Sequence, residues 1–167
     1  MSLVEQTGKS NIYEAGCGEG NLSLMLKEKG YQVHGSDFSK SIINIARAEK
    51  EGYRKSMFEV KSIYNLNSNT DKRDLVCCCE VLEHIEHPRK GLESLLNIVG
   101  QYIIMSVPRE PIWRAMNFVR GKYISEWGNT PGHINHWSRR QFVDLVSDYF
   151  EPLVVLTPLP WTMILAR

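Results

Sequence analysis

The sequence predicts an α/β fold: a Rossmann-like, doubly wound, mostly parallel sheet of seven strands with helices on both faces. Three observations support this fold class. Short runs rich in apolar and β-branched residues alternate with longer amphipathic runs along the chain. The run at 74–79 ends in five consecutive apolar residues, which is typical of a parallel strand buried on both faces. Seven strand candidates fit in 167 residues, the size of one domain.

The strand candidates are bounded by glycine, proline or polar residues. The first ends in a cluster of glycines, and the fifth ends at Pro108, which cannot donate a ladder hydrogen bond. The strands expected from this pattern are, in order, 11–15, 31–36, 56–60, 74–79, 102–108, 151–157 and 160–166.

The helix candidates lie between the strands and carry apolar residues at helical spacing. Leu22 and Leu26 are one turn apart in the first of them, and Ser39 and Ser138 are N-cap residues of two others. The helices expected from this pattern are, in order, 21–30, 39–52, 88–100, 111–123 and 138–149.

Composition indicates one globular domain, 1–167, in a reducing compartment. Twenty Lys and Arg against nineteen Asp and Glu give a net charge of +1, which offers no general attraction to nucleic acid. No apolar run approaches the roughly 18 residues of a membrane span, and we see no secretory signal. Three of the four cysteines are adjacent, so a disulfide framework is not expected. We therefore expect a cytoplasmic protein.

A glycine-rich turn, EAGCGEGN, directly follows the first strand. Gly16, Gly18 and Gly20 allow a sharp turn and a close approach of a ligand to the next helix N-terminus. A dinucleotide site would need G-x-G-x-x-G, and here the third glycine comes one residue early. Glu14 would also repel a diphosphate, whereas it can accept from an ammonium or hydroxyl group. The turn favours a cationic cofactor without phosphate and argues against a nicotinamide-dependent oxidoreductase.

Asp37 follows the second strand, about twenty residues after the glycines, where a carboxylate can accept from both ribose hydroxyls. The alternative is a glycine turn followed by an Asp that caps a helix.

The segments IYEAGCGEGNLSLML, VHGSDFSKSIINIA and DLVCCCEVLEHIEHPRKGLESL resemble the seven-stranded, S-adenosylmethionine-dependent methyltransferases. The resemblance implies S-adenosylmethionine as the cofactor. Its implied binding set is Glu14, Gly16, Cys17, Gly18, Gly20, Asp37, Phe38, Ile42, Ser62, Ile63 and Glu80.

The stretch CCCEVLEHIEHP divides into a strand and a polar segment. Its three cysteines are expected to be buried strand residues that alternate between the two faces. Glu80, Glu83 and His84 share one face if the segment is helical, and could bind a divalent ion. The alternative is that Glu80 and His84 contact cofactor or backbone and that Glu83 forms a salt bridge.

This element resembles the E-x-x-E-H of ubiquinone-biosynthesis O-methyltransferases and of small-RNA 2′-O-methyltransferases. The RNA enzymes add a histidine in a pattern like HINHWSRRQF, which corresponds here to His133. The resemblance implies Mg or Zn ligands at Glu80, Glu83, His84 and His133. The candidate bases for a hydroxyl acceptor are His84, His133 and His136.

Residues 109–137 form an insertion between the fifth strand and the last helix, and are expected to act as a lid or substrate wall. Its helix is either packed over the sheet edge or an interfacial helix that makes peripheral membrane contact. We expect O-methylation of a small-molecule, quinone-like, lipid-linked or sugar acceptor. RNA ranks lower because no added RNA-binding module is seen, and a non-catalytic cofactor-binding module is the other alternative. About ten residues precede the first strand, so we expect an N-terminal helical cover over the site to be absent or truncated.

Overall fold

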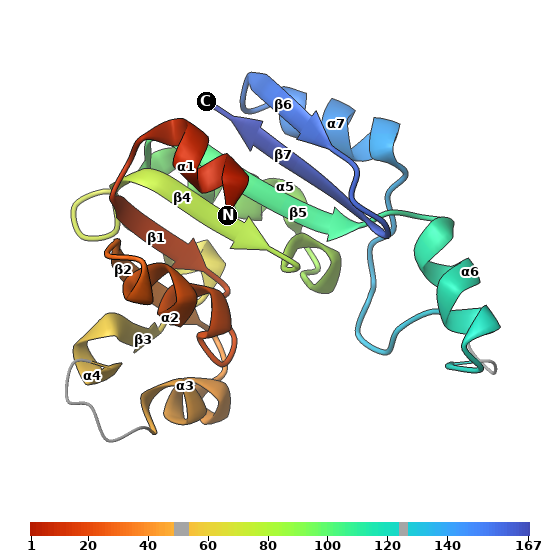
Figure 1. Ribbon diagram of the computed structural model, residues 1–167, viewed down its shortest axis with the longest axis horizontal. Coiled ribbons are helices and arrows are strands. Elements are labelled where there is room, and N and C mark those ends of the chain that lie inside the picture. The colour runs from red at the N-terminus through yellow and green to blue at the C-terminus, as the bar shows by residue number, and fades with distance from the viewer. Residues whose placement is uncertain (49–53, 124–126) are drawn as a thin grey trace.

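The computed structural model describes residues 1–48, 54–123 and 127–167, and these form one seven-stranded sheet with helices on both faces (Figure 1). The strand order is β3-β2-β1-β4-β5-β7-β6. All pairs from β3 to β5 are parallel, and β7 runs antiparallel to both β5 and β6. The predicted doubly wound, mostly parallel sheet is confirmed.

The elements follow the expected order with shifted ends. The strands are β1 Asn11–Ala15, β2 Gln32–Asp37, β3 Phe58–Val60, β4 Arg73–Cys79, β5 Val99–Pro108, β6 Pro152–Leu156 and β7 Trp161–Ala166. The α-helices are α1 Ser2–Thr7, α2 Asn21–Glu28, α3 Lys40–Arg47, α4 Arg54–Met57, α5 Pro88–Ile98, α6 Ile112–Val119 and α7 Arg139–Ser147. The described part of the chain also holds two short 3₁₀ helices, η1 Ile63–Asn65 and η2 Leu82–His84.

Several boundaries differ from the prediction. Residues 56–57, expected in a strand, lie in α4, and residues 99–100, expected in a helix, begin β5. The helix expected at 39–52 spans Lys40–Arg47, and its predicted part at 49–52 lies outside the described residues. α1 was not expected. It forms because Leu3 and Val4 are 3% and 4% exposed in one core cluster, and this burial stabilises a helix of only six residues.

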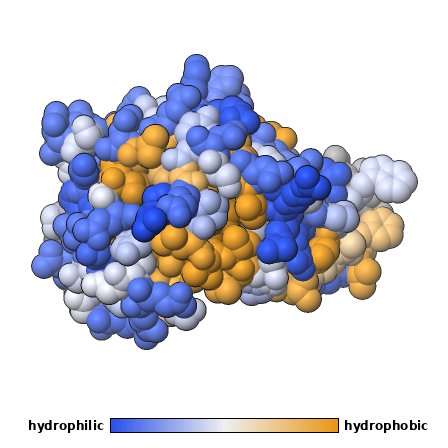
Figure 2. All heavy atoms as spheres, turned by 90° about the horizontal axis from the view of Figure 1, so that it is seen from above, coloured by the Kyte–Doolittle hydropathy of each residue, from blue (hydrophilic) through white to orange (hydrophobic). Residues whose placement is uncertain are grey.

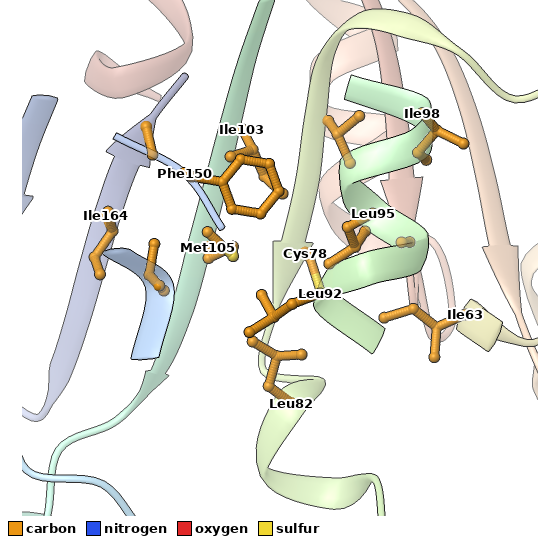
Figure 3. Close-up of a cluster of buried hydrophobic side chains, with 14 of the residues drawn as sticks. Ile63, Cys78, Leu82, Leu92, Leu95, Ile98, Ile103, Met105, Phe150 and Ile164 are labelled. Atoms are coloured by element: carbon orange, nitrogen blue, oxygen red, sulfur yellow. The ribbon is translucent and has the colours of Figure 1, made fainter. Parts of the chain in front are cut away.

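The core lies on both sides of the sheet. On one side α1, α2 and α3 pack against the strands, with Leu26 and Ile43 fully buried. On the other side α5 presents Leu92, Leu95 and Ile98 to the strands (Figure 3). α7 covers β6 and β7 on the same side. The two helix layers leave the C-terminal ends of the parallel strands as the edge where a ligand can enter.

The adjacent cysteines are strand residues, as predicted. Cys77 packs in the cluster that contains α1, and Cys78 packs in the opposite cluster beneath α5. Cys79 is partly buried, and no two described cysteines are joined. Burial raises the pKa of the Cys77 and Cys78 thiols well above their ordinary value, so they behave as small apolar side chains.

α6 projects from the sheet on the side of the molecule away from α2 and α3 (Figure 1). Its last turn exposes Phe118 and Val119, and apolar atoms appear at this end of the space-filling view (Figure 2). Within the part of the chain that the structure describes, no helix has the length and apolarity needed to cross a membrane.

Candidate active site

The glycine turn joins β1 to α2 and lies against the end of β2. The backbone N–H groups of Gly16 and Cys17 both donate to the Ser36 carbonyl, at 2.7 and 2.8 Å. Gly16 has φ +74°, and a Cβ there would lie 2.3 Å from Cγ2 of Val81 at the tip of β4. Gly18 has φ +54° with open space where a side chain would stand. Glycine at 16 therefore allows the turn after β1 to contact the end of β4. Glycine at 18 leaves the position of a side chain unfilled.

Asp37 ties this turn to the next helix. Its Oδ2 accepts from the Gly18 N–H at 3.2 Å, and its Oδ1 accepts from the Ser39 N–H at 2.9 Å. Ser39 is the N-cap of α3, as predicted, and its side chain accepts from the Ile42 N–H. The Asp37 carboxylate is thus held in place by two backbone donors at the rim of a cavity.

That cavity has a volume of about 700 Å³ and lies at the C-terminal ends of the parallel strands. Seven of the predicted cofactor residues line it, namely Gly16, Gly18, Asp37, Phe38, Ser62, Ile63 and Glu80. The remaining lining residues are Lys61, Tyr64, Val81, His84, Ile85, Glu86 and Gly132. Phe38 is 78% exposed at this rim, so most of this apolar residue is uncovered by protein.

Four predicted cofactor residues do not line the cavity, namely Glu14, Cys17, Gly20 and Ile42. Glu14 is 5% exposed and accepts a hydrogen bond from the Ser23 hydroxyl. Burial raises its pKa to about 7, against the opposing effect of that hydrogen bond. In this structure Glu14 therefore supports the start of α2 rather than reaching into the cavity.

Gly20 also has a packing role. It is the N-cap of α2, with φ +84°, and a Cβ there would lie 2.5 Å from Cζ of Phe58. The third glycine of the turn thus allows β3 to pack close to the start of α2. Cys17 is 6% exposed in the same cluster as Phe58.

Glu80 lies at the tip of β4 with its carboxylate bound to the protein. It has φ +59°, in the left-handed region, so the chain turns sharply before η2. Ser106 Oγ donates to its Oε1 and Trp161 Nε1 to its Oε2, both at 2.8 Å. The sequence placed Glu80, Glu83 and His84 on one face only if the segment is helical, and that condition is not met at Glu80, because η2 begins at Leu82.

Three of the four predicted metal ligands do come together. Glu83, His84 and His133 offer ligand atoms within 4.8 Å of one another. The His84 and His133 rings meet edge to face with centroids 4.7 Å apart. His84 Nδ1 lies 3.0 Å from the Gly132 carbonyl oxygen. Because a carbonyl can only accept, this contact assigns a proton to Nδ1 and leaves Nε2 as the nitrogen available to a ligand.

Glu83 and His133 are buried in this cluster and titrate accordingly. Glu83 is 1% exposed, and neither of its carboxylate oxygens has a hydrogen-bond partner among the described residues. Burial, followed by the charge of Glu80, raises the Glu83 pKa to about 8. Burial, followed by the charges of His84 and His136, lowers the His133 pKa to about 4. A buried carboxylate without partners beside two imidazoles is a donor set suited to a borderline cation.

His136 lies apart from that cluster. It lines a second cavity between the start of α5 and α7, and its Nδ1 is 2.7 Å from the Asn135 carbonyl oxygen. The three predicted bases therefore have different surroundings: His84 is exposed on the first cavity, His133 is buried in contact with it, and His136 lines the second cavity.

Sequence reasoning missed several residues of the site. Lys61 and Tyr64 directly flank the predicted Ser62 and Ile63, so extending that segment by one residue each way would have found them. Trp161 is 81 positions from Glu80, and no local pattern connects the two. Its place follows from the pairing of β7 with β5, which brings Trp161 opposite Pro108.

The chain is similar to known proteins in sequence and in fold. Residues 3–149 match a family model described as "Methyltransferase domain". The ubiquinone biosynthesis O-methyltransferase of Aeromonas salmonicida is 28% identical, over 68% of this chain and 50% of its own length. That of Coxiella burnetii (strain RSA 331) is 22% identical over 86% of this chain and 68% of its own length. The chain thus spans half the length of the Aeromonas relative.

Among solved structures, the magnesium protoporphyrin IX methyltransferase of Synechocystis PCC 6803 with bound SAH has the same fold. The TM-score is 0.71 at 18% identity, over 99% of this chain and 81% of the other. A SAM-dependent methyltransferase of Methanosarcina mazei has a TM-score of 0.75 at 19% identity, over 99% and 96% of the two chains.

Proposed function

The chain belongs to the methyltransferase domain family, and on that premise we propose that it transfers the methyl group of S-adenosylmethionine to an oxygen of a small-molecule acceptor. The observation that carries the proposal is the cavity at the strand ends, where Gly16, Gly18 and Asp37 meet. A nucleoside requires an acceptor for its ribose hydroxyls and close backbone approach, and these residues supply both. The bare ring of Phe38 offers an apolar surface for the adenine.

The absence of a dinucleotide pattern also fits this cofactor. The turn has no third glycine at the position that a diphosphate requires, and the cavity wall carries the Asp37 and Glu80 carboxylates. S-adenosylmethionine is cationic at sulfur, and acidic groups at the cavity favour a cation. When bound, it supplies an activated methyl group, so the protein has only to align the acceptor and remove a proton.

His84 is the base that the geometry favours for a hydroxyl acceptor. Among the described lining residues it is the one histidine, it is exposed, and its Nε2 is available to accept a proton because Nδ1 faces the Gly132 carbonyl. His133 is buried behind it and contacts it edge to face. His136 opens onto the second cavity, so its role as a base is the least supported of the three.

A divalent cation is a second part of the proposal, with Glu83, His84 and His133 as its ligands. The fit rests on the two unpartnered buried oxygens of Glu83 beside two imidazole rings. Two nitrogen ligands and one carboxylate suit Zn better than Mg, which prefers oxygen ligands. Glu80 stays outside this set because Ser106 and Trp161 bind its carboxylate. A bound cation would lower the pKa of an acceptor hydroxyl.

One nitrogen of His84 cannot serve both roles at once. If Nε2 binds a cation it is not the base, and if it is the base the ligand set is incomplete. Chelator separates the two: turnover that survives chelator supports the base, and turnover that needs added Zn supports the cation. In both cases His84→Ala lowers turnover, and His87→Ala, an exposed histidine three positions further on that does not line this cavity, serves as the matched control.

The acceptor class is proposed from the relatives. The two ubiquinone biosynthesis O-methyltransferases support a catechol-like or quinone-like small molecule, and the balanced charge of the chain gives no support to RNA. The test is transfer of labelled methyl from S-adenosylmethionine to a panel of catechols, sugars and short RNAs. We expect label in a catechol. Label only in RNA would overturn the acceptor class. S-adenosylhomocysteine binding without transfer to any acceptor would indicate a non-catalytic module.

A further inference from the structure

The segment 128–135, which carries His133, is fastened on one side to α6. Trp113 Nε1 donates to Thr130 Oγ1 at 2.9 Å. Asn117 Nδ2 donates to the same oxygen at 3.2 Å and to the Gly128 carbonyl at 3.0 Å. Asn117 is only 5% exposed although it lies on a projecting helix. A Cβ at Gly128 would lie 2.3 Å from the Arg114 carbonyl oxygen, so helix and segment are in direct backbone contact.

The same segment is fastened on its other side to η2. The backbone N–H groups of Ile134 and Asn135 donate to the Glu83 carbonyl at 2.9 and 3.0 Å. Asn135 Nδ2 donates to the carbonyls of Leu82 and Ile85, at 3.1 and 2.7 Å. Segment 128–135 therefore connects α6 to η2, which carries Glu83 and His84. His133 lies between these two sets of hydrogen bonds.

Trp113 also covers the His133 ring itself. The two ring centroids are 5.9 Å apart and the planes are inclined by 24°, within the range of offset stacking. On its other side Trp113 contacts Trp161, with centroids 6.0 Å apart, and Trp161 is the donor to Glu80. A loop histidine free to turn about its side-chain bonds would rarely present a nitrogen to Glu83 and His84. A neighbouring ring packed on its face restricts that rotation.

We propose that Trp113 is a positioning residue. It fixes the orientation of the His133 ring so that the ring faces Glu83 and His84, and α6 holds Trp113 in place. The inference rests on the cation site of the proposed function. It assigns α6 a fixed structural role in place of a lid that opens. Mutating a residue that orients a metal ligand without binding the metal itself typically weakens cation binding about 10- to 100-fold.

The test compares Trp113→Leu, Trp113→Phe and the matched control Trp127→Leu. Trp127 belongs to the same insertion but is 80% exposed. The first readout is the NMR shifts of the His133 imidazole protons in chelator, which report the ring current of the indole. The second is Zn affinity by calorimetry, and the third is S-adenosylhomocysteine affinity, which monitors the fold of the distant glycine turn.

We expect Trp113→Leu to move the His133 proton shifts and to weaken Zn binding about 10- to 100-fold, with S-adenosylhomocysteine binding unchanged. Trp113→Phe, which keeps an aromatic ring but loses the donor to Thr130, should recover most of the affinity. Trp127→Leu should match the wild type. Unchanged His133 shifts in a folded Trp113→Leu variant would overturn the inference. If His133→Ala binds Zn as the wild type does, the cation site itself fails, while the imidazole shifts still decide whether Trp113 packs on the ring.

Discussion

Replacing Glu83 by glutamine should stabilise the cation-free protein at neutral pH. Both oxygens of Glu83 are buried without a partner, and burial raises its pKa from 4.5 to about 8. In the unfolded chain the carboxyl group is ionised at pH 7, so folding must bind a proton. At about 1.4 kcal/mol for each pH unit above the unfolded pKa, this proton uptake costs roughly 3 kcal/mol at pH 7. Glutamine has the same shape and no charge, and avoids this cost.

The sign of the pH dependence follows from the raised pKa of Glu83. The folded state binds more protons than the unfolded state between pH 4.5 and 8, so stability falls as pH rises through this window. Below pH 4.5 the group is protonated in both states and contributes nothing. The gain from Glu83→Gln should therefore be roughly 3 kcal/mol at pH 7 and under about 1 kcal/mol at pH 5.

Urea unfolding in chelator at both pH values measures this gain. The difference at pH 7 corresponds to a rise in Tm of roughly 6 to 12 °C for a chain of this size. Glu86→Gln is the matched control, because Glu86 is exposed on the same segment and its substitution should change little. Added Zn should stabilise the wild type and not the Glu83→Gln variant. A variant that is equal to or less stable than the wild type at pH 7 would refute the reasoning.

Three further predictions concern the rest of the site. Asp37→Ala should weaken S-adenosylhomocysteine binding by roughly 2 to 3 kcal/mol, the worth of hydrogen bonds to a charged group, and unchanged affinity by calorimetry would remove Asp37 from the site. Gly16→Ala should lower the unfolding free energy by roughly 2 to 5 kcal/mol, because left-handed strain adds to the clash with Val81. Gly18→Ala should lower the unfolding free energy only by the left-handed strain, roughly 1 to 2 kcal/mol. Equal losses of stability for the Gly16 and Gly18 variants in thermal melts would contradict this comparison. All four thiols should resist a disulfide reagent at pH 8 in the folded protein, because burial raises the pKa of each, and fast labelling before unfolding would be the contrary result.

The sequence was sufficient for the fold because each strand is short, apolar and followed by a clear turn. The glycine cluster after 11–15 and the apolar run at 74–79 are local signals, and the sheet places both as expected. The added helix α1 could not be foreseen in this way. A helix of six residues has little stability of its own, and it forms here because the sheet buries its apolar side.

The site residues could be predicted where they follow neighbouring parallel strands. They were harder to predict where segments far apart in the sequence meet. Gly16, Gly18 and Asp37 lie together because β1 and β2 are adjacent and parallel. Glu83 and His133 were paired from a resemblance, and their contact depends on segment 128–135 crossing back to η2. The direction of the Glu80 side chain depends on its positive φ, which is uncommon for a residue other than glycine, and on Trp161, which lies 81 positions away.

The central claim is that the glycine turn and Asp37 bind an S-adenosyl cofactor. Titration calorimetry of the purified chain with S-adenosylhomocysteine and with NAD, in parallel, tests it most directly. The account predicts one S-adenosylhomocysteine bound per chain and no heat from NAD under the same conditions. Binding of NAD with no response to S-adenosylhomocysteine would contradict it.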